Sequence, residues 1–286
     1  MSKRNLRRLL ITAGCALVGA LLMAYPFVSN FLYEHRQQEV IYHYQQAVEE
    51  TDSTRIQEAL DAAEQYNAVL RESHFVITEP FDPDAAQLED GATYFDLLNL
   101  TGDSRMGYIE IPRISVHLPI YHGTSATVLE NGVGHLENTS LPVGGAGTHA
   151  VLSAHAGLSD KKLFTDLVLL EIGDRFYIHV LDRTLAYEVD QIEVVLPHET
   201  ENLQIVSGED YVTLVTCTPY GVNSHRLLVR GKAIPYVPEE QEAVQQAPKA
   251  QSPWMRQYVQ AVCTGTALLV ALLFLVWFLR RRRRHE

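Results

Sequence analysis

The segment with the clearest capacity for chemistry is "TLVTCTPYGVNSHR", residues 213–226. Cys217 ends a β-branched run, a turn-rich loop follows, and Arg226 begins the next run. A cysteine attacks as the thiolate, which needs a base or a cation nearby, usually a histidine. The attacked carbonyl becomes an oxyanion, which needs positive charge or N–H donors. If the two runs are antiparallel neighbours, the forked guanidinium of Arg226 lies beside Cys217.

The other two cysteines lie in long uncharged runs. Cys15 belongs to residues 9–33 and Cys263 to residues 258–279, each long enough to span a bilayer. A cysteine in such a run is usually an inert hydrophobe. Cys217 therefore has no intrachain disulfide partner and cannot form a Cys-rich zinc site, so we expect no metal and no other cofactor. A buried structural thiol, an intermolecular disulfide and a reactive nucleophile remain as alternatives.

The base for such a thiol has to be chosen from 12 histidines. His155 ends the run "THAVLSAH" and is followed by small residues that leave space around it. His122, His149 and His225 are alternatives, although His225 precedes Arg226 directly and strand alternation points it to the opposite face. Spacing alone favours His155 and leaves the choice open.

Basic residues flank the two apolar runs on their terminal sides. Lys3, Arg4, Arg7 and Arg8 precede the first run, and five consecutive arginines, Arg280 to Arg284, follow the second. The positive-inside rule predicts that both termini are cytoplasmic and that the domain between the runs is extracellular. A cleaved signal peptide is the alternative for the first run, whose length favours an uncleaved anchor.

The formal charge of −12 is distributed unevenly along the chain. Nine of the 23 basic residues and one of the 35 acidic residues lie in the two tails, so 14 basic and 34 acidic residues remain elsewhere. Such an acidic domain repels nucleic acid phosphates, so we expect no nucleic acid partner. Solubility alone explains the charge.

The remaining sequence predicts a mainly β protein with added helices. In residues 34–74, Ile56, Leu60, Ala63 and Leu70 form a helical stripe, and Thr54 with Gln57 fits a capping box. Eight short runs between residues 105 and 236 are typical of strands in a closed barrel or sandwich: 106–111, 118–121, 148–155, 175–180, 184–189, 191–196, 211–217 and 225–231. Residues 161–170 fit one short helix.

The sequence predicts an organisation in seven parts. These are a tail with the N-terminal transmembrane segment (1–33), a helical appendage (34–74), an acidic loop (75–104), a β-barrel domain (105–236), a linker (237–257), a C-terminal transmembrane helix (258–279) and a basic tail (280–286). Long loops in compact domains tend to be functional lids or disordered segments.

Several motifs together resemble the sortases. "TLVTC" followed by "HR" is similar to the sortase signature, and "SAHAG" (153–157) is similar to the segment that carries the sortase histidine. Longer stretches, including "GYIEIPRISVHLPIYHGTS" and "GVGHLENTSLPVGG", resemble class C sortases, the pilin-polymerising branch. The resemblance covers about residues 40–236. A C-terminal membrane segment after the domain is also typical of class C.

This resemblance implies an eight-stranded sortase-type barrel with cysteine transpeptidase activity. It implies that Cys217 is the nucleophile, His155 the acid or base, and Arg226 the group that stabilises the oxyanion. Such enzymes cleave an LPxTG-like sorting signal between Thr and Gly, hold the Thr as a thioester and pass it to an amine. In class C this amine belongs to a pilin lysine.

Class C sortases also share a lid with an Asp-Pro-aromatic motif, from which this chain departs. "TEPFDPD" has Glu79-Pro80-Phe81 followed by Asp82-Pro83. We expect Glu79 to pair with Arg226 and Phe81 to cover Cys217, with Asp82 as the alternative partner of Arg226.

Three hypotheses follow from the sequence. The first is a membrane-anchored transpeptidase that assembles pili. The second is a sortase that anchors surface proteins to cell-wall peptide amines. The third is a membrane-tethered scaffold without catalysis, in which Cys217 is a packing residue.

Overall fold

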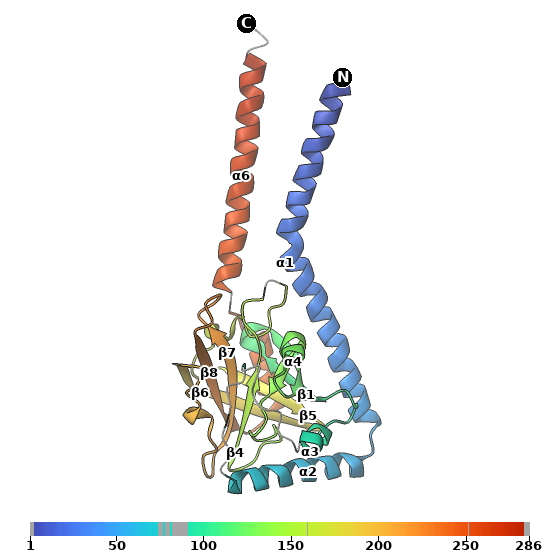
Figure 1. The fold of residues 1–286 in the computed structure, drawn as a ribbon, viewed down its shortest axis with the longest axis vertical. Helices are drawn as coiled ribbons and strands as arrows, with labels where there is room; N and C mark the ends of the chain where they lie inside the picture. The colour runs from blue at the N-terminus through green and yellow to red at the C-terminus, as the bar shows by residue number, and fades with distance from the viewer. Residues whose placement is uncertain are drawn as a thin grey trace. The chain divides into compact units, whose positions relative to one another are not determined.

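The computed structural model describes residues 3–73, 77, 81, 91–158, 160–250 and 252–282. The chain divides into two compact units, residues 26–249 and residues 1–25 with 250–286. The second unit contains the start of helix α1 (Lys3–Glu50) and helix α6 (Pro253–Arg282) (Figure 1). Two helical stretches, Gly14–Glu50 and Arg256–Leu275, each contain an 18-residue window that is long and apolar enough to cross a membrane, with mean hydropathies of 1.7 and 2.0 for those windows.

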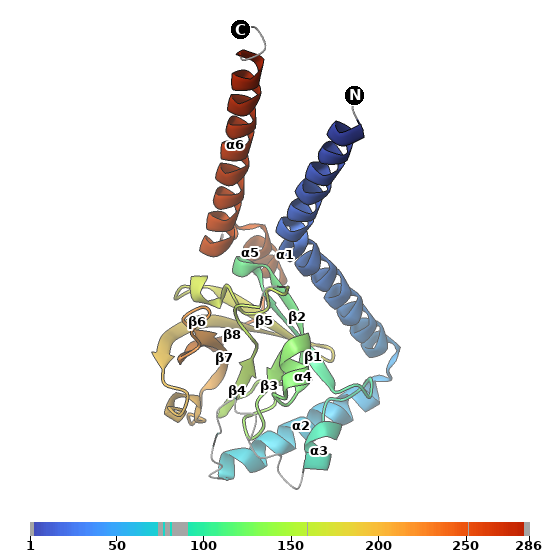
Figure 2. The ribbon, with the colours of Figure 1, turned by 45° about the horizontal axis from the view of Figure 1, so that its top comes forward.

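Residues 26–249 are built around a closed eight-stranded β-barrel (Figure 2). The strand order around the barrel is β1-β2-β3-β4-β7-β8-β6-β5. The strands are β1 (Arg105–Ile111), β2 (Val116–His122), β3 (Val133–His135), β4 (Thr148–Ser153), β5 (Arg175–Val180), β6 (Arg183–Val195), β7 (Asp210–Thr218) and β8 (His225–Ile234). The predicted eight-stranded barrel is therefore confirmed.

Two of the strand pairs are parallel, namely β2 with β3 and β4 with β7. The other pairs around the barrel are antiparallel. In the β4–β7 pair, Thr148 lies opposite Asp210 and Ser153 opposite Val215. β7 and β8 lie between β4 and β6 in the barrel, so the strand that carries Cys217 pairs with β4 on one side and with β8 on the other.

Some strand boundaries differ from the sequence prediction. The predicted strands 184–189 and 191–196 are one strand, β6, whose register shifts between Val189 and Gln191 at a β-bulge. Asp190, which separates the two predicted runs, is the extra residue at this bulge. The three-residue strand β3 was not predicted, because its short run is flanked and interrupted by glycines. The predicted helix 161–170 is wrong, because the structure has turns there and a short 3-10 helix, η2 (Leu167–Leu169).

Helix α2 (Ser53–Glu72) packs its predicted stripe inward. Ile56, Leu60, Ala63 and Leu70 are all buried. Asn67 extends the stripe, and its side chain both donates to Leu141 O at 3.0 Å and accepts from Leu141 N at 2.7 Å. The predicted capping box is wrong: the N-cap is Asp52, whose carboxylate accepts from Thr54 N at 2.8 Å. An acidic residue there also complements the helix dipole.

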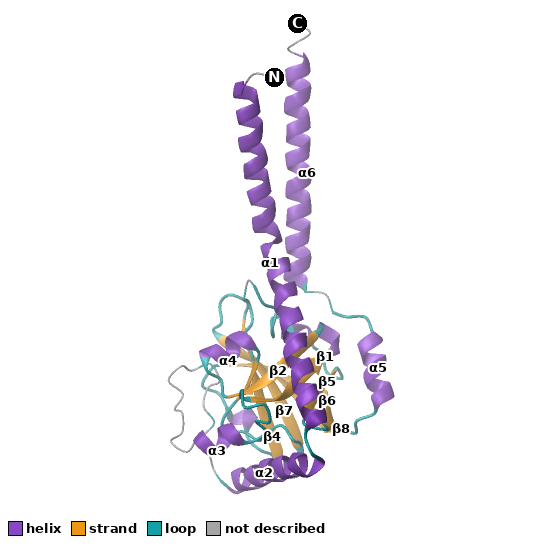
Figure 3. Cartoon of the chain, turned by 90° about the vertical axis from the view of Figure 1, so that its right-hand side faces the viewer, coloured by secondary structure: helices purple, strands orange, loops and turns teal. Residues whose placement is uncertain are grey.

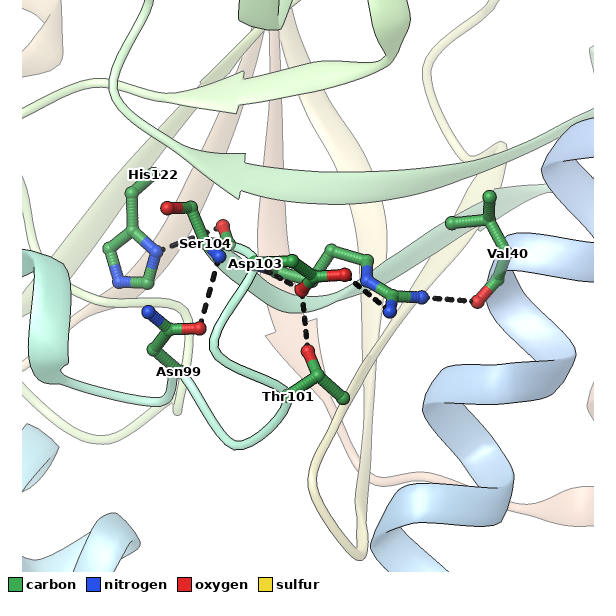
Figure 4. Close-up of polar contacts among 7 residues, drawn as sticks. Val40, Asn99, Thr101, Asp103, Ser104 and His122 are labelled. Atoms are coloured by element: carbon green, nitrogen blue, oxygen red, sulfur yellow. Dashed lines mark hydrogen bonds and ion pairs between the residues drawn. The ribbon is translucent and has the colours of Figure 1, made fainter.

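The second half of α1 also packs on the barrel. Tyr44 is buried and its hydroxyl donates to Met106 O at 3.0 Å. Arg105, which is also buried, donates to Val40 O at 2.5 Å and pairs with Asp103. Figure 4 shows Val40, Asp103 and Thr101 along this chain of contacts. The second half of α1 is therefore attached to the barrel through Val40 and Tyr44.

Short helices interrupt the remaining connections (Figure 3). Helix α3 (Gly91–Asp96) lies within residues 75–104, which were expected to be loop throughout. Helix α5 (Pro238–Gln246) lies within the expected linker 237–257, where Pro238 begins the helix and Glu239 and Glu240 occupy its first turn. The other short helices are α4 (Ala126–Asn131) and the 3-10 helices η1 (Pro112–Ile114) and η3 (Glu201–Leu203).

Candidate active site

Cys217 and Arg226 lie directly opposite each other on neighbouring strands. β7 and β8 are antiparallel, and their register pairs Cys217 with Arg226 and Thr218 with His225. Directly opposed residues of a β-ladder project from the same face of the sheet. The hairpin between the strands therefore brings a thiol and a guanidinium to the same place, as the sequence predicted.

His155 reaches the same level from the other side of β7. β4 ends at Ser153 opposite Val215, and this parallel register, extended by two residues, sets His155 level with Cys217. Two hydrogen bonds hold the extension: Ala154 N donates to Val215 O at 3.2 Å, and the Thr216 hydroxyl donates to Ala154 O at 2.7 Å. The three candidate residues thus come from three adjacent strands at one height of the barrel.

The phenyl ring of Phe81 contacts the side chains on both sides of Cys217. Its centroid lies 5.6 Å from the imidazole centroid of His155, and the guanidinium carbon of Arg226 lies 5.1 Å from it. Phe81 also packs against a hydrophobic cluster on this face of the sheet, formed by Ile77, Leu136, Val151, Leu203, Val215 and Leu228. Glu79 and Asp82 lie outside the described residues, so their pairing with Arg226 stays a prediction.

Backbone carbonyls orient the Arg226 guanidinium. Its Nη1 donates to Asn223 O and His225 O, both at 3.1 Å. Asn223 has a positive φ of 59° and donates its backbone N–H to Pro219 O at 3.0 Å, which closes the loop between the strands. Asparagine tolerates this left-handed conformation better than most residues. The conformation of the β7–β8 loop, which Asn223 favours, therefore determines the orientation of the Arg226 guanidinium.

Burial determines the protonation of His155. Its imidazole is half-buried, and this loss of solvation is the main cause that lowers its pKa below 6.5. Glu130 acts in the opposite direction, and Lys161 lowers the pKa further. Neutral imidazole is therefore favoured at neutral pH, which is the form that accepts a proton.

The alternative histidines have other partners. His149 is buried between Gln204 O at 2.8 Å and the Thr213 hydroxyl at 2.7 Å, and burial lowers its pKa to about 4. His122 is buried, and its ring nitrogens contact Leu97 O at 2.7 Å and Ser104 O at 3.0 Å. Figure 4 shows the contact with Ser104. His225 contacts the Ser224 hydroxyl at 2.9 Å. Of these four histidines, His155 alone continues β4 to the level of Cys217.

Comparison with known proteins agrees with this geometry. A sequence model described as the sortase domain matches residues 109–234. The crystal structure of Sortase C from Streptococcus pneumoniae is 46% identical, with a TM-score of 0.63, covering 69% of this chain and 97% of that one. The chain belongs to the sortase family.

Two further sortases show how widely the likeness extends. Sortase C-1 from Actinomyces oris is 47% identical, with a TM-score of 0.61, covering 64% of this chain and 99% of that structure. Sortase A from Bacillus anthracis is 26% identical over 218 residues, covering 76% of this chain and 90% of that protein. The protein is therefore a cysteine transpeptidase with class C structural neighbours, as the sequence resemblance implied.

Two further buried hydroxyl residues lie next to the candidate site residues, and the sequence did not single out either of them. Thr216 is buried next to the candidate nucleophile and hydrogen-bonds to the residue before His155. Ser153 is buried at the end of β4, two residues before His155. Their roles depend on the β4–β7 pairing, which leaves no local signal in the sequence. Among the described residues, no three His, Cys, Asp or Glu side chains lie close enough to hold a metal ion.

Proposed function

We propose that this sortase is a membrane-anchored transpeptidase that cleaves an LPxTG-like sorting signal and joins it to a pilin lysine. The observation that carries the proposal is the register across three strands, in which Cys217 lies opposite Arg226 and level with His155. A thiol, a neutral imidazole and a fixed cation at one level are the groups that acyl transfer requires.

The first half of the reaction forms a thioester. The Cys217 thiolate attacks the carbonyl carbon of the signal's Thr, and the oxygen gains negative charge beside the Arg226 guanidinium. His155 takes the proton of the Cys217 thiol as the sulfur attacks and then gives this proton to the leaving amine of Gly, so that the C–N bond breaks and the Thr stays on Cys217. Each group acts where charge or a proton develops in the transition state, which is where such groups accelerate a reaction.

The second half transfers the Thr to an amine. A pilin lysine attacks the thioester as the free amine, His155 accepts the proton that this amine loses, and Cys217 leaves as the thiolate. The lowered pKa of His155 supports this role, because the imidazole must be neutral to accept the proton. Arg226 again stabilises the oxyanion.

The anchoring belongs to the same proposal. The two apolar helices cross the membrane, the basic tails remain in the cytoplasm, and residues 34–257 face the outside. This topology holds the site near a surface where exported pilins arrive with their own sorting signals. The acidic composition of the domain keeps it soluble there.

The identity of the acceptor amine rests on the structural neighbours. Sortase C of Streptococcus pneumoniae, whose structure addresses its pilin substrate specificity, is 46% identical to this chain. Sortase A of Bacillus anthracis, at 26% identity, is more distant. The higher identity favours the pilin acceptor.

Expression of the chain with a candidate pilin tests the proposal. The wild type should produce a ladder of covalent pilin oligomers, and Cys217→Ala should abolish it without changing the thermal unfolding of the barrel. A ladder with Cys217→Ala would refute the mechanism. A product in which the pilin is joined only to cell-wall peptide would refute the acceptor and support the alternative.

A further inference from the structure

Ser153 lies on the same face of the sheet as the candidate active-site residues. It is the last residue of β4, opposite Val215 of β7 and Gly134 of β3. Alternate residues of a strand share a face, so Ser153 projects from the same face as Val151 before it and His155 after it. Its register partner Val215 and its neighbour Val151 both belong to the hydrophobic cluster under Phe81.

The hydroxyl of Ser153 has no hydrogen-bond partner within the described part of the chain. Its residue is completely buried, with an exposure of 0%. Four other buried hydroxyls on or near β4 and β7 are all bonded, namely those of Thr139, Ser140, Thr213 and Thr216. A buried hydroxyl without a partner is destabilising, because it has lost its hydrogen bonds to water and gained none.

Alanine would fill this position without that destabilisation. The surroundings of Ser153 are apolar on one side and glycine on the other, so packing alone gives no reason for an oxygen there. A buried polar group without a partner requires an explanation, and a functional role is one. Ile77 and Phe81 pack on this face, and Phe81 also contacts His155 and Arg226 beside Cys217, so a peptide that binds along this face toward Cys217 would replace these contacts.

We infer that Ser153 is a substrate-binding residue, whose hydroxyl donates a hydrogen bond to a backbone carbonyl of the sorting signal when the peptide displaces Phe81. This rests on the proposed function of the site. Ser153 is level with Val215, two residues from Cys217, which is about 7 Å along a strand. The carbonyl that it binds therefore belongs to a residue within about two positions of the cleaved bond.

Ser153→Ala in the full chain tests the inference, with Thr216→Val as the matched control. Both variants remove one buried hydroxyl near His155, but only the Thr216 hydroxyl is bonded in the structure. Both are made in a Phe81→Ala background, in detergent, so that the site is open. Three quantities are measured: kcat/KM for an LPxTG-like peptide with excess hydroxylamine, the thermal unfolding midpoint, and the alkylation rate of Cys217 by iodoacetamide.

The expected result separates binding from structure. Ser153→Ala should lower kcat/KM by about tenfold, the effect of one hydrogen bond, and leave the unfolding midpoint equal or higher. The alkylation rate should not change, because this reagent contains no sorting signal. Thr216→Val should lower the midpoint. An unchanged kcat/KM for Ser153→Ala, a lowered midpoint or an altered alkylation rate would each overturn the inference.

A backbone-modified peptide identifies the bonded carbonyl. Replacing one amide by an ester weakens that carbonyl as an acceptor, so at the correct position the ester should slow the parent enzyme and have less effect on Ser153→Ala. Equal effects on both enzymes at every position near the cleaved bond would refute the hydrogen bond. A parent enzyme that cleaves no peptide would refute the proposed function itself.

Discussion

Removal of the Phe81 ring should expose Cys217. The ring makes one aromatic contact with His155 and one cation–π contact with Arg226, at 5.6 Å and 5.1 Å. An aromatic pair contributes about 0.5–1.5 kcal/mol and a cation–π contact about 0.5–1 kcal/mol. Together they stabilise the covered state by about 2 kcal/mol, which corresponds to a factor of about 30 in its population.

Phe81→Ala should therefore raise the rate at which a small thiol reagent modifies Cys217 by about 30-fold, and should raise the hydrolysis of a free peptide. Peptide mapping distinguishes Cys217 from Cys15 and Cys263, which lie in the apolar helices. Phe81→Leu is the matched control, because it keeps apolar bulk over the cluster but loses both ring contacts. Its rate should lie between those of the wild type and Phe81→Ala.

Equal modification rates in all three proteins would show that Phe81 does not cover Cys217. Glu79→Ala added to Phe81→Ala tests the other part of the lid. The double variant should react faster still if Glu79 holds the segment by pairing with Arg226. No further increase would exclude Glu79 and make Asp82 the next residue to test.

Three other predictions follow from the same structure. Arg226→Lys keeps the positive charge but loses the paired N–H donors of the guanidinium, so the rate of peptide cleavage should fall about a hundredfold. A wild-type rate would mean that Arg226 has only a structural role. Burial lowers the pKa of His149 to about 4 and that of His135 to about 3. In the unfolded state both imidazoles titrate near their ordinary pKa of about 6.5, so the unfolded state binds protons before the folded state does as the pH falls. The free energy of unfolding should then decrease from pH 7 to pH 5, by at most about 1.4 kcal/mol per pH unit for each histidine, and a flat profile in denaturant titrations would contradict this. A reporter fused after Glu286 should behave as cytoplasmic, and an extracellular signal would overturn the proposed orientation.

Local patterns in the sequence were sufficient for the elements that depend on local contacts. The stripe of α2 follows from helical spacing, and the position of Cys217 opposite Arg226 follows from a hairpin with a short loop. The N-cap was misplaced by two residues because Asp52 and Thr54 both have side chains that can cap a helix, and only the backbone path decides between them.

The choice of His155 depends on information that no local pattern contains. His149 and His155 lie on the same face of one extended run, so periodicity cannot distinguish them. The parallel pairing with β7 places His149 opposite Tyr211 and only His155 level with Cys217. This register joins residues far apart in the sequence, and for the same reason the unpartnered hydroxyl of Ser153 was not foreseen.

The pairing of β4 with β7 also affects when during synthesis the site can form. The hydrogen bond from Thr216 to Ala154 spans 62 positions of the chain, and closing so long a loop has an entropic cost that local contacts avoid. β7 and β8 are the last strands in the sequence, yet they lie between β4 and β6. A nascent chain that ends before β7 therefore contains His155 but has neither a closed barrel nor the nucleophile. Peptide-cleavage activity should consequently be detected only for chains in which β7 and β8 have been synthesised and have folded into the barrel.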